Sequence, residues 1–235
     1  PKEVKRLQLD VLQSMNRDHL SFRNNDDALE GAIESMELGF RMQMIAPDLM
    51  DISTESADTL ERYRVGKNIK LGTCRPSDFG RQCLLARRLA EAGVRFIQVN
   101  HSYPRNYWDA HGGLKGNHSS NASKVDQPIA GLLRDLKGRG MLDETLVVFG
   151  TEFGRTPAAQ GGDGRDHHPH GFTVWFAGAG IRGGTIHGET DELGFHAIEP
   201  SHYVTDMHAT VLHLLGLDPE KLDIPGRQRL DIDRG

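Results

Sequence analysis

Three loops in the second half of the chain carry side chains that suit metal binding. Asp109 and His111 lie two residues apart on a glycine-flanked loop, which allows both side chains to turn toward one point. Glu152 follows an apolar run farther along the chain. A last group of candidate ligands precedes the next apolar run: Asp166, His167, His168 and His170. Carboxylates and imidazoles suit zinc, manganese or iron, and the lack of thiolates nearby favours a catalytic over a structural zinc.

Each of these features alone has a simpler explanation. An isolated Asp-x-His pair more often makes loop hydrogen bonds than it binds a metal. We favour a metal site because polar groups that converge from several strand ends mark functional clefts. Arg155, the candidate catalytic residue, is open to two interpretations: it holds an anionic substrate by a bidentate contact, or it neutralises Glu152.

Short apolar runs beside these residues predict the strands that would position them. The runs TLVVFG (Thr145–Gly150) and FTVWFA (Phe172–Ala177) are short and rich in β-branched or aromatic residues. Apolar residues alternate over Val94–Val99, which predicts a third strand. If the three strands lie side by side in a parallel sheet, their loops open at one edge and the candidate ligands meet there.

Helical patterns precede and separate the strands. Apolar residues recur at helical spacing, or follow capping residues, over 27–44, 53–63, 77–92, 124–139 and 205–215. This alternation predicts an α/β fold with a mostly parallel sheet flanked by helices, and a helical N-terminal part. We expect residues 1–76 to be a helical segment packed on a main domain of residues 77–235, and residues 100–123 to be a long loop.

Composition restricts the class of function. A net charge of -5 without a long basic run argues against a nucleic-acid-binding protein. No apolar stretch is long enough to cross a membrane. Cys74 and Cys83 do not form a CxxC pair and are too few for a disulfide scaffold, and whether they pair stays open.

Five motifs, taken in their order along the chain, resemble a bacterial family. They are WDAH, GTEFGRTP, GRDHHPHGF, AGAGIRGGTIHGETDE and DMHATVLHLLGLD. Together they are similar to motifs of the bacterial domain-of-unknown-function 1501 proteins, which are described as sulfatase-like and related to the alkaline phosphatase superfamily. The resemblance is strong over residues 77–220 and weak in the helical first part.

The resemblance implies a ligand set for one metal ion. In that superfamily two metal ions sit at the C-terminal edge of a mixed sheet, and one is held by an Asp, a nearby His and a later His. Asp109, His111 and His167 match these positions, with His168 or His170 as alternatives for the last.

The resemblance also implies an altered second metal site. The superfamily's Asp-His pair after a strand corresponds to Glu152 and Phe153, and phenylalanine cannot bind a metal. The nucleophile of the superfamily comes from its first strands, for which this chain shows no counterpart. Because the chain opens on Pro1 rather than methionine, we expect it to be a processed or partial piece that matches the C-terminal portion of the fold.

These observations predict a metal-dependent hydrolase of phosphate or sulfate esters. Its cofactor would be a divalent metal, zinc first, with manganese, iron or calcium as alternatives. The expected substrate is a small anionic ester or a sulfated or phosphorylated carbohydrate. The rival hypothesis is a non-catalytic alkaline-phosphatase-like binding or assembly module with a degenerate metal site. A periplasmic or secreted location is implied by the resemblance alone.

Overall fold

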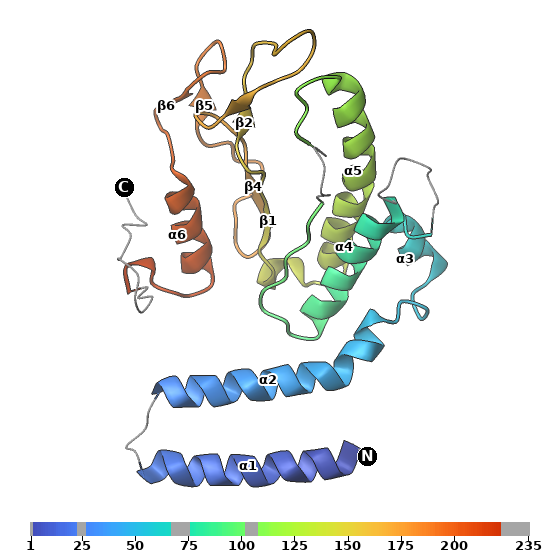
Figure 1. The fold of residues 1–235 in the computed structure, drawn as a ribbon, viewed down its shortest axis with the longest axis vertical. Helices are drawn as coiled ribbons and strands as arrows, with labels where there is room; N and C mark the ends of the chain where they lie inside the picture. Colours follow the sequence, from blue (N-terminus) through green and yellow to red (C-terminus); the bar gives the residue numbers. More distant parts are fainter. Residues whose placement is uncertain (1, 23–26, 67–75, 102–107, 222–235) are drawn as a thin grey trace. The chain divides into compact units, whose positions relative to one another are not determined.

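The computed structural model of the chain describes residues 2–22, 27–66, 76–101 and 108–221, and Figure 1 shows its elements. The chain forms two compact units, Pro1–Thr54 and Glu55–Gly235. The first unit contains α1 (Lys2–Phe22) and α2 (Asp27–Met50), whose side chains meet in a hydrogen bond from Gln13 to Glu37. The predicted helical N-terminal part is therefore confirmed. The predicted packing of residues 1–76 on the main domain stays a prediction.

The second unit begins with three helices that share a core. They are α3 (Ala57–Arg62), α4 (Pro76–Glu91) and α5 (Leu114–Gly138), and α4 lies beside α5 (Figure 1). The core side chains include Tyr63, Phe79, Cys83, Leu84 and Leu136, all less than a tenth exposed. Burial raises the pKa of the Cys83 thiol to about 12. Cys74, its potential partner, lies outside the described residues.

A buried ionic network joins these helices. The Arg87 guanidinium lies 2.6 Å from Oε1 of Glu55 and 3.2 Å from Oδ2 of Asp135. The Tyr63 hydroxyl donates to Asp135 at 3.0 Å. Burial first, and then the Asp135 charge, raises the pKa of Tyr63, so the phenol stays a neutral donor. Removing one member would leave another charge buried without its partner.

Three two-stranded antiparallel sheets follow. They pair β1 (Val147–Phe149) with β4 (Trp175–Ala177), β2 (Gly154–Arg155) with β3 (His167–His168), and β5 (Glu189–Thr190) with β6 (Ala197–Ile198). The predicted mostly parallel sheet is wrong for the described residues. A parallel pair needs a crossover connection, usually a helix. The chain between β1 and β4 instead contains the β2–β3 pair and returns antiparallel.

Two further boundaries differ from the sequence prediction. Val94–Val99 forms no strand, and Phe96 in this segment is 81% exposed. α5 begins at Leu114 instead of near Lys124, so the predicted loop over residues 100–123 is shorter than expected. The helices predicted over 77–92 and 205–215 are confirmed as α4 and as α6 (Val204–Leu214). In the described part of the chain, no helix is both long and apolar enough to span a membrane.

Candidate metal centre

Asp109, His111 and His167 bring three potential metal ligands together. One ligand atom from each residue lies within 4.8 Å of the others. The Nε2 atoms of His111 and His167 are each 2.9 Å from Oδ1 of Asp109. Asp109 and His111 come from the segment before α5, whereas His167 begins β3. The predicted convergence is thus present for these three residues.

A glycine-rich turn holds His111 in place. The amide of Arg165 donates to the Ala110 carbonyl at 3.0 Å, and the amide of Gly113 donates to Oδ1 of Asp163 at 2.8 Å. A Cβ atom on Gly164 would lie 1.9 Å from the His111 carbonyl oxygen. Only glycine therefore allows the two backbones to approach this closely.

Gln160 orients the imidazole of His111 through a contact between its Oε1 and Nδ1. In the tautomer with the proton on Nδ1, that nitrogen donates to the Gln160 amide oxygen and Nε2 keeps a lone pair for a metal. Metal-bound histidines commonly donate their other N–H to such an oxygen.

Sequence reasoning missed Gln160, Asp163 and Gly164. The turn is closed by backbone hydrogen bonds between Gln160 and Gly164, of 2.8 and 3.0 Å. The one signal in the sequence was the run GGDG, whose density of glycine indicates a tight turn or a close approach of two backbones.

His167 is positioned by the β2–β3 pair. It lies opposite Arg155 in the ladder, and the Thr156 amide extends that ladder by donating to the Asp166 carbonyl at 3.0 Å. The ring of Phe153 packs against the His167 imidazole with centroids 4.4 Å apart. Phe153 therefore supports a candidate ligand, although it cannot bind a metal itself.

Arg155 makes its closest contact with a candidate metal ligand. Its Nη1 lies 2.6 Å from Oδ1 of Asp109, and its Nη2 lies 3.4 Å from Oε1 of Glu152. The hydrogen bond with His167, together with the contact of Arg155, lowers the pKa of Asp109 to about 2. Asp109 is therefore a carboxylate at neutral pH, as a metal ligand must be.

Four of the seven predicted ligands lie outside the triad. The side chain of Glu152 is 62% exposed, and its carboxylate lies 3.4 Å from Nη2 of Arg155. Asp166 accepts the His167 amide at 2.8 Å and so supports the backbone. His168 is buried and contacts the Phe195 carbonyl, and the His170 ring lies beside that of His196. Successive strand residues point to opposite faces, which separates His168 from His167.

The donor set fits a divalent transition metal. Two imidazoles and one carboxylate are a common three-ligand set for zinc, with a fourth position left to water or substrate. The three side chains are between 31% and 46% exposed, so that fourth position can face solvent. Manganese and iron accept the same donors, whereas calcium prefers six to eight oxygen ligands and fits less well.

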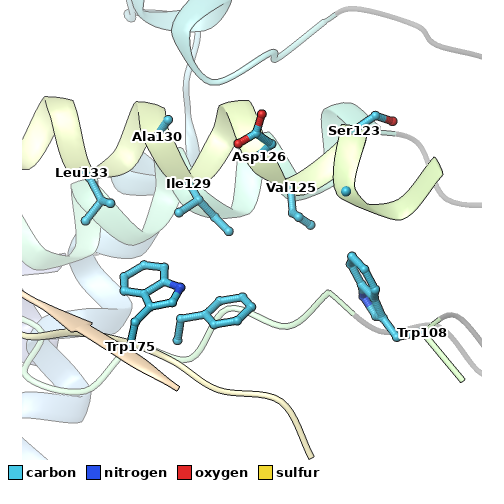
Figure 2. A pocket seen from close by; sticks show the side chains of 10 residues that line it. Trp108, Ser123, Val125, Asp126, Ile129, Ala130, Leu133 and Trp175 are labelled. Atoms are coloured by element: carbon cyan, nitrogen blue, oxygen red, sulfur yellow. The ribbon is translucent and has the colours of Figure 1, made fainter. Parts of the chain in front are cut away.

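A hollow of about 530 Å³ lies between α5 and the β1–β4 pair (Figure 2). Its lining includes Trp108, Ile129 and the stacked rings of Phe149 and Trp175, whose planes differ by 4°. The indole N–H of Trp108 donates to Nδ1 of His101 at 3.0 Å. None of the three triad residues lines this hollow, but Trp108 directly precedes Asp109.

Comparison with known families gives a match over nearly the whole chain. The model of a family described as "Protein of unknown function (DUF1501)" matches residues 1–230. No significant match was found among curated proteins or solved structures. The match confirms the family that the five motifs resemble, whereas the link to sulfatases and the alkaline phosphatase superfamily stays a prediction.

Proposed function

We propose that this chain, which belongs to the DUF1501 family of proteins of unknown function, is a metal-dependent hydrolase of phosphate or sulfate esters. The observation that supports this most is the meeting of Asp109, His111 and His167, the first and last of which are 58 residues apart. A guanidinium lies against the same carboxylate. Cationic groups gathered at one point favour an anionic ester, because they neutralise charge on its oxygens.

A divalent metal held by the triad would polarise the ester oxygen and stabilise the departing oxyanion. Gln160 keeps the His111 ring in the orientation that presents Nε2 toward Asp109. Arg155 carries five N–H donors in a planar fork and can hold two nonbridging oxygens of a phosphate or sulfate group. To do so, its guanidinium would exchange the contact with Asp109 for one with the substrate.

In the overall reaction the oxygen of water ends on phosphorus or sulfur, and the ester oxygen leaves with a proton as an alcohol. The attacking nucleophile is not assigned to a residue of this chain. The alcohol part of the substrate would lie toward Trp108, which directly precedes Asp109 in the chain and whose indole lines the aromatic hollow (Figure 2). Small aryl esters and sulfated or phosphorylated sugars both offer a ring that can stack on such a surface.

The test is an esterase screen with 4-nitrophenyl phosphate and 4-nitrophenyl sulfate in the presence of added Zn²⁺ or Mn²⁺. We expect metal-dependent release of nitrophenol that falls at least about 100-fold in Asp109→Asn and His111→Ala, since the metal contributes several kcal/mol to charge stabilisation. His213→Ala, on an exposed position of α6, is the matched control and should keep full activity. Unchanged turnover in both triad variants would refute the proposal.

One set of contacts favours the rival function, a non-catalytic binding or assembly module with a degenerate metal site. Arg155 is already paired with Asp109, and Phe153 stands where the resemblance implies a second-metal ligand. Under this alternative the chain binds about one equivalent of Zn²⁺ that is lost in His167→Ala, but it hydrolyses neither ester. Zinc content and ester turnover measured together on the wild type and on His167→Ala therefore discriminate between the two functions.

A further inference from the structure

Three nitrogen atoms crowd one oxygen of Asp109. Nη1 of Arg155 lies 2.6 Å from Oδ1, and the Nε2 atoms of His111 and His167 each lie 2.9 Å from the same oxygen. A carboxylate oxygen has about two lone-pair sites. The guanidinium therefore competes for the oxygen that the triad would offer to a metal.

The β2–β3 pair fixes Arg155 beside the triad. Arg155 lies directly opposite His167 in the ladder, and side chains of directly opposed residues point to the same face. The guanidinium carbon of Arg155 lies 5.8 Å from the centroid of the Phe153 ring, which also packs against His167. The Arg155 side chain is only 17% exposed. Its position is therefore set by the same elements that place His167.

The present contacts of Arg155 leave part of its donor capacity unused. Its Nη1 is buried, and among the described residues it has no acceptor with hydrogen-bond geometry in spite of its short distance to Asp109. Nη2 lies 3.4 Å from the exposed carboxylate of Glu152, which is a long contact. A buried N–H group without an acceptor costs free energy. A sulfate or phosphate group, with several oxygens, would give the guanidinium better partners.

The charge of Arg155 opposes a cation at the triad. The guanidinium neutralises the Asp109 carboxylate, whose negative charge is the one that the triad supplies to a metal. Like charges a few ångströms apart repel, and the low exposure of Arg155 limits screening by solvent and salt. An oxyanion that drew Arg155 away would release the carboxylate charge for the metal. The two binding events would therefore favour each other.

We propose that Arg155 couples the binding of metal and oxyanion at this site. A sulfate or phosphate group that takes the guanidinium from Asp109 raises the affinity of the triad for Zn²⁺, and Zn²⁺ raises the affinity for the oxyanion by the same factor, because such coupling is reciprocal. This inference rests on the metal triad and the anionic substrate of the proposed hydrolase. It adds that, without an oxyanion, Arg155 keeps the affinity of the triad for metal low.

The experiment measures the Zn²⁺ affinity of the full chain by competition with a chromophoric chelator, with and without inorganic sulfate at constant ionic strength. We expect sulfate to tighten Zn²⁺ binding by the wild type at least about tenfold, a factor typical of coupled sites. Arg155→Gln should bind Zn²⁺ at least about tenfold more tightly than the wild type without sulfate, and sulfate should change its affinity by less than about threefold. The matched control is Arg182→Gln, which removes the same charge from an exposed position and should behave like the wild type.

The opposite role for Arg155 gives the opposite result. If the guanidinium stays on Asp109 and supports it as a metal ligand, its removal weakens Zn²⁺ binding about 10–100-fold. Weaker binding by folded Arg155→Gln would therefore overturn the coupling.

A wild-type affinity that does not change with sulfate, or an equal effect of sulfate in the wild type and Arg155→Gln, would also overturn the coupling. In these cases the triad still binds Zn²⁺ and the proposed hydrolase keeps its basis. No Zn²⁺ binding by the folded wild type, with or without sulfate, would overturn both. Far-UV circular dichroism checks each fold, and Arg155→Met, which keeps an unbranched apolar stem, replaces Arg155→Gln if that variant does not fold.

Discussion

Replacing Gly164 with alanine should disrupt the metal triad without touching any ligand. The added Cβ would lie 1.9 Å from the carbonyl oxygen of His111 and 2.2 Å from its carbonyl carbon. Both neighbours are backbone atoms, so no side chain can rotate away. The turn that contains Gly164 and the loop that contains His111 must therefore separate.

The size of this separation sets the expected loss of affinity. An ordinary van der Waals contact begins near 3.4 Å, so the two segments must move apart by about 1.5 Å. Metal–ligand distances tolerate deviations of only about 0.2 Å. The displacement also pulls His111 from Gln160, and loss of such a supporting contact alone weakens metal binding about 10–100-fold. We therefore expect Gly164→Ala to bind Zn²⁺ at the triad at least about 100-fold more weakly than the wild type.

The assay is calorimetric titration of the stripped protein with Zn²⁺. Gly162→Ala is the matched control, because a Cβ at Gly162, in the same turn, meets nothing within 4 Å. The control should bind like its parent. If folded Gly164→Ala binds Zn²⁺ within about threefold of Gly162→Ala, the close backbone approach does not position His111 and the reasoning is wrong.

Two further predictions concern the helical core and the residues beside the hollow. Asp135→Ala removes a partner of Arg87, whose side chain is 3% exposed, and should lower the free energy of unfolding in urea by about 3–5 kcal/mol. The exposed control Asp126→Ala should change this free energy by less than about 0.5 kcal/mol. A loss below about 1 kcal/mol in Asp135→Ala would contradict the buried network. Burial, and then the charge of Lys124, lowers the pKa of His101 from 6.5 to about 4. The unfolded chain therefore binds more protons between these values, so the stability that the neutral ring contributes is complete above pH 6.5 and is lost as the pH falls toward 4. The urea midpoint should consequently fall more from pH 7 to pH 4.5 in the wild type than in His101→Gln, and an equal fall in both would show that His101 titrates normally.

The sequence by itself was sufficient for features that depend on neighbouring residues. α2, α4 and α6 follow from the periodicity of apolar residues, because helix hydrogen bonds and helix faces involve residues three and four apart. The sequence also indicated the types of ligand, a carboxylate and imidazoles on polar loops. The helices and the ligand types depend on residues that are close in the sequence, so both can be predicted without knowledge of the tertiary structure.

Strand pairing could not be predicted in the same way. The apolar run of Val94–Val99 has a strand pattern, yet no ladder forms there, because a strand exists only when another backbone pairs with it. Val147–Phe149 did find a partner, but Trp175–Ala177 pairs with it in the antiparallel direction. That direction depends on the path of the intervening chain, which the apolar pattern does not encode.

The composition of the metal centre was decided by tertiary structure as well. One carboxylate and three histidines close together in the sequence, Asp166, His167, His168 and His170, looked equivalent. The alternation of β3 sends His167 to Asp109 and His168 to the opposite face. Gln160 and Gly164 gain their roles only through contact with His111, about fifty residues earlier in the chain. The sequence thus determined which chemical groups this protein can offer a metal. The packing of distant backbones determined which of them meet, because hydrogen bonds and van der Waals contacts act across space whatever the separation along the chain.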